Sequence, residues 1–247
     1  MKKQMLGFAG EFKAGKSTAT TRLKVWYPGT RSSRYSDPLR EFLVGFNEMK
    51  SRNMFCMVSD ELLVGKHVTD ALPKIFSTKV AELGDKEKQR EFVAWLVNTW
   101  FNQPELVKED RHNLQELSTA VRSIFAENIL ERTIVARVGR MRTKSPIVVV
   151  EGIRRLVDIG ILLLSPNFHL TYIEIDPMVA YQRMVKQNEN VGDAEMTFER
   201  FMELRNAEAE QQTRFLKPHA HLVIDNSGPP EVMERILRAE VAKWLAP

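Results

Sequence analysis

The sequence predicts an α/β fold in which helices cover both faces of a parallel sheet. Short apolar runs rich in β-branched residues alternate with longer segments of helical period along most of the chain. A glycine-rich stretch, "GFAGEFKAGKST", overlaps the end of the first apolar run and leads into the first helical segment. A chain of 247 residues, 43% of them hydrophobic, can bury the core that such a fold needs.

Five segments of the chain are predicted to be strands of this sheet. Four are apolar runs bounded by Gly, Pro, Asn or Asp, as buried parallel strands usually are: Gln4–Gly10, Pro146–Gly152, Leu170–Asp176 and Ala220–Asn226. A weaker fifth candidate, Thr30–Ser36, lies between a Pro-Gly turn and Asp37-Pro38. The sequence therefore favours a five-stranded parallel sheet.

The segments between these strands have helical period, and several open with proline, which is favourable at the first helical position. The predicted helices are Lys16–Val25, Pro38–Met49, Asn113–Val138, Arg155–Leu164, Pro177–Gln187, Thr197–Leu216 and Pro230–Trp244.

The region from residue 50 to residue 111 interrupts the alternation of strands and helices. It is polar, carries a charge run that indicates an exposed helix face, and ends in the apolar cluster "FVAWLVNTWF". We interpret it as a mainly helical insertion. Trp95 and Trp100 are expected to pack the insertion down rather than to stack on a ligand.

Composition narrows the functional classes. A formal net charge of +4 and an isoelectric point near 9.1 suit an anionic ligand such as a nucleotide, but the charge is too diffuse to establish nucleic-acid binding. Cys56 is the single cysteine, so an internal disulfide is excluded and a reducing compartment is indicated. No apolar run approaches the roughly 20 residues that cross a bilayer. We therefore expect a cytoplasmic protein with no membrane partner.

The glycine-rich stretch matches the phosphate-binding pattern G-x-x-x-x-G-K-[ST] through Gly10, Gly15, Lys16 and Ser17. Glycine lets the backbone N–H groups approach phosphate oxygens, and the following helix N-terminus adds partial positive charge. Lys16 supplies an ammonium for the β- and γ-phosphates of ATP, and the Ser17 hydroxyl can ligate Mg²⁺. The expected cofactor-binding set is Gly10, Lys13, Ala14, Gly15, Lys16, Ser17 and Thr18.

A phosphate loop alone does not define a reaction, because GTPases, motor ATPases and small-molecule kinases all use one. The guanine-recognition tetrapeptide N-K-x-D is absent from the sequence. The best match to the acidic strand end of a motor ATPase is "VVVEG", which ends in the single acid Glu151. A short chain with a helical insertion after the second strand is more typical of a nucleotide kinase.

Four further stretches carry a resemblance to one family. They are "YSDPLREFL", "RHNLQELSTAVRSIF", "VVVEGIRRLVDIGIL" and "HLVIDNSGPPEVMERI". With the phosphate loop they resemble, in order and over about half of the chain, the P-loop deoxynucleoside monophosphate kinases of phages and the related archaeal dephospho-coenzyme A kinase-like proteins. The resemblance implies a single three-layer P-loop kinase domain over 1–247, an insertion at 50–111 above the acceptor site, and a lid at 183–200.

The resemblance also implies roles for individual residues. Asp37 and Arg40 would hold the acceptor, although Asp37 is equally compatible with a helix cap. Gln115 and Arg122, two helical turns apart, would read a base edge and a phosphate, with a solvated helix face as the alternative.

Further implied roles belong to the catalytic centre. Glu151, where the family more usually has Asp, would contact Mg²⁺ through water or bind the acceptor. Arg154 would clamp the acceptor phosphate, and Arg183, with Lys186 or Arg205, would close from the lid onto the transferred phosphate. The turn that contains Asn226 would support the adenine.

The favoured function is ATP-dependent transfer of the γ-phosphate to a deoxynucleoside monophosphate. An alternative acceptor is a hydroxyl, either of 5-hydroxymethyluracil in phage DNA or of dephospho-coenzyme A, in which case Asp37 or Glu151 would take the proton. A third hypothesis is a nucleotide-binding regulatory protein without catalysis. The expected partner is a small nucleotide or modified DNA. The protein would act in the cytoplasm, including that of a phage-infected host cell. A homodimer is compatible with the sequence.

Overall fold

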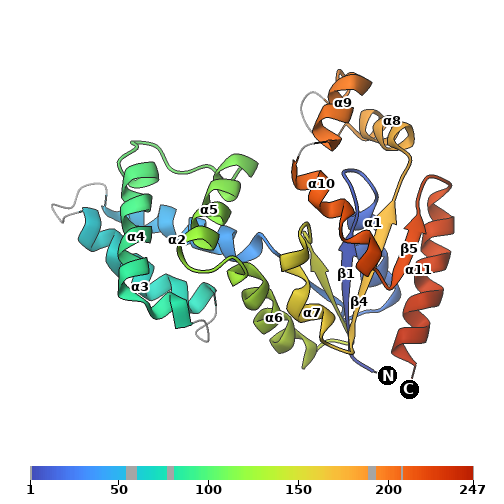
Figure 1. Cartoon of the computed structure of the whole chain (residues 1–247), viewed down its shortest axis with the longest axis horizontal. Coiled ribbons are helices and arrows are strands. Elements are labelled where there is room, and N and C mark those ends of the chain that lie inside the picture. The colour runs from blue at the N-terminus through green and yellow to red at the C-terminus, as the bar shows by residue number, and fades with distance from the viewer. Residues whose placement is uncertain (1, 54–59, 77–80, 189–192, 207, 247) are drawn as a thin grey trace. The chain divides into compact units, whose positions relative to one another are not determined.

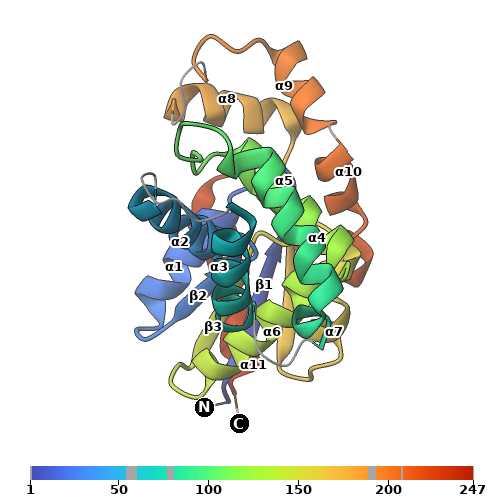
Figure 2. The ribbon, with the colours of Figure 1, turned by 90° about the vertical axis from the view of Figure 1, so that its left-hand side faces the viewer.

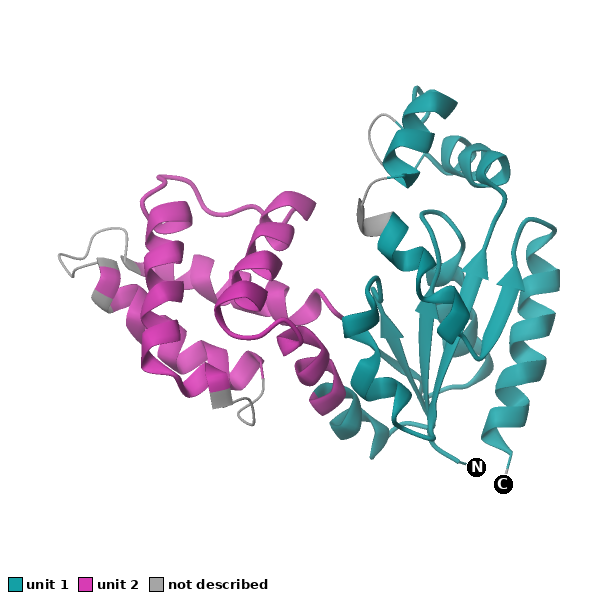
Figure 3. Ribbon diagram, viewed as in Figure 1, with its two compact units in different colours: residues 1–34, 137–247 teal, residues 35–136 magenta. Residues whose placement is uncertain are grey.

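A computed structural model describes residues 2–53, 60–76, 81–188, 193–206 and 208–246 (Figure 1). The chain divides into two compact units, unit 1 with residues 1–34 and 137–247 and unit 2 with residues 35–136 (Figure 3). Each unit is described by itself below. Cys56, on which the expectation of a reducing compartment rests, lies outside the described residues.

Unit 1 contains the sheet that the sequence predicts. The strands are β1 (Gln4–Ala9), β2 (Arg31–Arg34), β3 (Ile147–Glu151), β4 (Phe168–Glu174) and β5 (Leu222–Asp225). Their order is β2-β3-β1-β4-β5, and every neighbouring pair is parallel. The prediction of five parallel strands is confirmed, including the weak candidate that became β2.

Helices cover both faces of this sheet because its central strands are apolar on both sides. All six residues of β1 are buried. One face packs against α1 (Lys16–Trp26), α8 (Pro177–Gln187), α9 (Phe198–Arg205) and α11 (Pro230–Leu245) through a single apolar cluster. The short α7 (Gly160–Leu163) packs beside β4 (Figure 2).

One long predicted helix, Asn113–Val138, is wrong as a single element. The structure has α5 (Arg111–Ile124) and α6 (Ile129–Arg142), separated by a turn. Periodicity did not reveal the break, because Phe125 is apolar and fits the helical pattern. Its ring is instead buried against Phe92, with 5.5 Å between the ring centroids, and the chain turns there.

Two other predicted helices are also divided. In place of Arg155–Leu164 the chain forms a 3₁₀ turn (Leu156–Asp158) before α7, because the buried Asp158 carboxylate accepts the backbone N–H groups of Arg154 and Arg155 at 3.1 and 3.0 Å. In place of Thr197–Leu216 it forms α9, α10 (Glu208–Arg214) and a 3₁₀ turn (Lys217–His219).

All regular secondary structure in the described residues of unit 2 is helical, and an irregular segment, 102–110, precedes α5. It comprises α2 (Asp37–Asn53), α3 (Asp60–Ile75), a 3₁₀ turn (Ala81–Gly84), α4 (Lys86–Leu96), a π turn (Val97–Phe101), α5 and the first part of α6. Aromatic rings form its core, and Trp100 is 2% exposed and packs against Phe46 and Trp95. The described residues of the predicted insertion 50–111 are mainly helical and belong to a unit that extends further in both directions. Its place above an acceptor site stays a prediction. No helix among the described residues is long and apolar enough to cross a membrane.

Candidate phosphate-binding site

The loop between β1 and α1 has a backbone that requires glycine at two positions. Gly10 has φ of 144° and Gly15 has φ of 100°. A Cβ at Gly10 would lie 2.2 Å from the Ile173 carbonyl oxygen, and one at Gly15 would lie 2.5 Å from Asn226 Nδ2. The loop therefore takes a tight path against β4 and the end of β5 that larger residues would not allow.

Lys16 and the first turn of α1 make this loop a positive site. Lys16 Nζ donates to the carbonyl oxygens of Gly10 at 2.6 Å and Glu11 at 2.7 Å, so its ammonium lies along the loop. Ser17 and Thr18 are exposed in the first turn, whose N–H groups have no carbonyl partner within the helix. An ammonium beside a helix N-terminus is an arrangement that binds phosphate.

Asn226, which follows β5, supports the loop through its side chain. It is 4% exposed, its Nδ2 donates to the Ala14 carbonyl oxygen at 2.9 Å, and its own N–H donates to the Glu174 carbonyl oxygen at 2.8 Å. The contact fixes the backbone of the loop at Ala14. The role of this turn in holding adenine stays a prediction.

Glu11 forms an ion-pair cluster that sequence reasoning missed. Its buried carboxylate accepts hydrogen bonds from Arg205 of α9 and Arg214 of α10, and Arg205 also donates to the Ile175 carbonyl oxygen at 2.9 Å. Burial and then the Glu11 carboxylate raise the pKa of Tyr172 to about 12. Arg205 was expected to act on phosphate from the lid, whereas here it holds a carboxylate of the phosphate loop.

Other cations near the predicted lid 183–200 also have partners within unit 1. Lys13 Nζ lies 3.5 Å from Gln187 Oε1 and 4.0 Å from Asp193 Oδ2. Arg183 donates to the Gly228 carbonyl oxygen at 2.8 Å, and Lys186 is exposed near the end of α8. Residues 189–192 lie outside the described residues, and closure of this segment over ATP stays a prediction.

Glu151 is the last residue of β3, the strand beside β1, and Arg154 follows it by three residues. The Glu151 carboxylate accepts from Arg34 Nε at 2.7 Å, and Arg154 is exposed. A hydroxyl at Ser17 and a carboxylate at Glu151, both at the carboxyl edge of the sheet, suit Mg²⁺, which takes one or two protein ligands together with phosphate oxygens and water. The donor chemistry of the two residues therefore fits the predicted metal.

The other predicted acceptor residues belong to unit 2. Asp37 is the first residue of α2, and Arg40 forms an ion pair with Glu109. Arg122 is buried and donates to the Glu127 carbonyl oxygen at 2.5 Å, so its guanidinium lies at the end of α5. Gln115 is exposed on the same helix. The binding roles of all four stay predictions.

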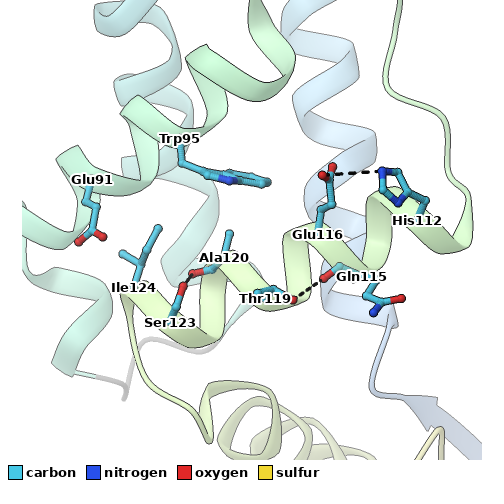
Figure 4. A pocket seen from close by; sticks show the side chains of 9 residues that line it. All are labelled: Glu91, Trp95, His112, Gln115, Glu116, Thr119, Ala120, Ser123 and Ile124. Carbon is cyan, nitrogen blue, oxygen red and sulfur yellow. Dashed lines mark hydrogen bonds and ion pairs between the residues drawn. The ribbon is translucent and has the colours of Figure 1, made fainter. Parts of the chain in front are cut away.

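Unit 2 contains a pocket of about 530 Å³ between α4 and α5, here called the α4–α5 pocket (Figure 4). Trp95 presents its ring to the pocket and also packs against Phe92 and Trp100, with centroid separations of 5.8 and 5.0 Å. The lining residues are Glu91, Trp95, His112, Gln115, Glu116, Thr119, Ala120, Ser123 and Ile124. A half-buried Trp beside polar side chains is a surface that a planar ligand can cover.

The sheet order and the phosphate loop together define a three-layer α/β fold with a P-loop after its first strand. No family model and no curated protein matches the chain. Similar solved structures include that of TT1252 from Thermus thermophilus, with 15% identity, 98% of each chain covered and a TM-score of 0.45. A dephospho-CoA kinase from Campylobacter jejuni has 12% identity, covers 98% of this chain and 97% of its own, and has a TM-score of 0.45. Structural similarities with sequence identities and TM-scores this low support no inference about the activity of this protein.

Proposed function

We propose that this protein is an ATP-dependent kinase that transfers the γ-phosphate of ATP to a deoxynucleoside monophosphate. The observation that carries the proposal is the loop between β1 and α1. Its glycines bring the backbone close to β4 and β5, and Lys16 Nζ is held by two loop carbonyl oxygens. Such a site receives a triphosphate, and the parallel sheet behind it holds the site rigid.

The chemistry of this proposal rests on positioning and charge. The N–H groups of the first turn of α1 and the Lys16 ammonium would hold the β- and γ-phosphates. Ser17 and Glu151 would hold Mg²⁺, which neutralises charge on the phosphates when bound. Arg154 and Arg183 are assigned to the transferred phosphate. Because a phosphate acceptor is already ionised, the reaction needs no strong general base.

We assign the nucleobase of the acceptor to the α4–α5 pocket. Trp95 offers an aromatic face for stacking, and Gln115 offers an amide for a base edge. Glu91 and Glu116 make the lining acidic, which disfavours a phosphate there and suits the N–H groups of a base. Within unit 2, the phosphate of the acceptor is accordingly assigned to Arg40 and Arg122.

The test is a panel of acceptors incubated with Mg-ATP and the full chain. The four deoxynucleoside monophosphates are tried first, then duplex DNA that contains 5-hydroxymethyluracil, and then dephospho-coenzyme A. ADP release and the mass of the product are measured in each reaction. A deoxynucleoside diphosphate as product supports the proposal. Phosphate on DNA or on dephospho-coenzyme A alone would replace it with a hydroxyl kinase, and no acceptor-dependent ADP release would favour a regulator.

Replacing Trp95 by leucine should raise the KM for the acceptor about tenfold or more, because stacking of a base on an aromatic ring contributes about 1–3 kcal/mol. The KM for ATP should not change. Steady-state kinetics measure both constants, and Trp95→Phe should restore most of the affinity because it retains a ring.

The matched control is Trp26→Leu. Trp26 is a half-buried tryptophan of α1, and its replacement should leave the KM for the acceptor unchanged. Circular dichroism checks the fold of each variant. An unchanged acceptor KM in folded Trp95→Leu would refute the assignment of the base to this pocket, while the kinase proposal would stand.

A further inference from the structure

Unit 1 carries a second cationic feature away from the phosphate loop. Arg31, Arg137, Arg140, Met141 and Lys144 line a hollow of about 320 Å³, here called the cationic hollow. Four of its five lining residues carry positive charge. By volume it could hold on the order of ten water molecules, since each takes about 30 Å³ in the liquid, so charged groups of a ligand can enter it.

The cationic hollow lies at the opposite edge of the sheet from the phosphate loop. Arg31 is the first residue of β2, and Lys144 precedes β3, which runs parallel to β2. Both are therefore at the amino edge, whereas the loop leaves the carboxyl end of β1. The end of α6 lies at the same end of unit 1 as the two termini (Figures 1 and 2). A ligand in the hollow would be separate from bound ATP.

The charges of the hollow exceed what the fold needs there. Within the described part of the chain, Arg31, Arg140 and Lys144 are exposed and form no ion pair with a carboxylate. Cations near the end of a helix balance its dipole, but that end carries only about half a negative charge. One cation would suffice for α6. The remaining positive charge is therefore available to an external anion.

We propose that the cationic hollow binds closely spaced phosphate groups, with the backbone of duplex DNA as their source. The hollow has no aromatic lining, so it offers no stacking surface for a base and would bind phosphates without reading sequence. Among the described residues, three exposed cations without a carboxylate partner, Arg31, Arg140 and Lys144, gather at this place and attract a polyanion there.

The experiment uses the full chain with saturating Mg-ADP, which occupies the phosphate loop. Fluorescence anisotropy measures binding of a labelled duplex of about 20 base pairs between about 50 and 200 mM KCl. The test variant is Arg140→Ala with Lys144→Ala. The control variant is Arg200→Ala with Lys217→Ala, which removes an exposed cation of α9 and one that pairs with Glu174 at the carboxyl end of β4.

The test variant should bind DNA about tenfold more weakly or worse, since a basic side chain near an anionic surface contributes about 1 kcal/mol. The slope of log K against log salt should fall by about 2, since each phosphate contact contributes about 0.9. The control variant should change neither the affinity for DNA nor the slope of log K against log salt. Equal weakening in both variants, or no binding of DNA by the parent chain, would overturn the DNA assignment.

A second arm separates DNA from a free polyphosphate. Calorimetry with inorganic tripolyphosphate is carried out on the same Mg-ADP-loaded proteins. Binding that the test variant loses and the control keeps supports the hollow as a phosphate site. If the hollow binds tripolyphosphate but the chain does not bind DNA, the phosphate groups come from a free polyphosphate. If neither ligand binds, the site itself is refuted. Both arms measure binding and not phosphoryl transfer, so their outcome does not depend on the proposed function.

Discussion

Replacing Lys16 by alanine should lower ATP-dependent phosphoryl transfer by about 100- to 1000-fold, the loss that follows when one preorganised charged or hydrogen-bonding group is removed from a transition state. The physical reason is the position of the ammonium. Two carbonyl oxygens of the loop hold Nζ at 2.6 and 2.7 Å, so the charge is in place before the substrate binds. The measurement is kcat/KM for ATP in the presence of the best acceptor from the panel.

The fold should survive this substitution. The two carbonyl oxygens lose a donor, but the site is only partly buried and water can replace it, so the free energy of unfolding should fall by no more than about 1 kcal/mol. Lys24→Ala, on the same helix and exposed, is the matched control and should keep full activity. Folded Lys16→Ala with ordinary turnover would show that this loop does not bind the donor phosphates.

Replacing Arg205 by methionine should reduce the free energy of unfolding by about 3 kcal/mol. Removing one partner of a buried ion pair costs about 3–5 kcal/mol, because the remaining charge stays in the interior without compensation. The loss should lie at the lower end of this range, because Glu11 keeps Arg214 as a second partner. The cost is measured by urea unfolding of the variant and the parent chain. Binding of ATP should also weaken, because the phosphates would meet a Glu11 carboxylate that is less neutralised.

A double-mutant cycle separates the pair from its surroundings. Glu11→Gln alone should destabilise the chain by a similar amount, because the Arg205 guanidinium then stays buried without a carboxylate. The double variant Glu11→Gln/Arg205→Met should lose less free energy of unfolding than the sum of the two single losses, by about 2 kcal/mol. The control is Arg200→Met, on the same helix but exposed, whose pair with Glu203 is worth no more than about 0.5 kcal/mol. Additive single effects would mean that Glu11 and Arg205 do not stabilise each other.

Much of unit 1 was predictable because its signals are local. β1, β3, β4 and β5 are apolar runs bounded by turn residues, so they could be placed within about two residues from composition and those turns alone. The phosphate loop is equally local, since Gly10 and Gly15, its two glycines with positive φ, lie only five positions apart in the sequence.

Helix ends inside long periodic segments were less predictable. The division between α5 and α6 depends on Phe125, which fits a helical pattern as well as it fits a turn. At the end of α5 this ring packs against Phe92, a residue of another helix. Periodicity describes one segment at a time and contains no information about such a contact.

The sequence by itself determined the sheet, the phosphate loop and Lys16 as its central cation, because those features follow from residues that are neighbours along the chain. Only the tertiary structure placed Arg205 and Arg214 on Glu11, across 194 and 203 residues, and the Asn226 side chain on the loop, across 212. Ion pairs and hydrogen bonds act through space, so partners at these separations are chosen by packing of the whole unit. No local pattern records which arginine will meet which carboxylate.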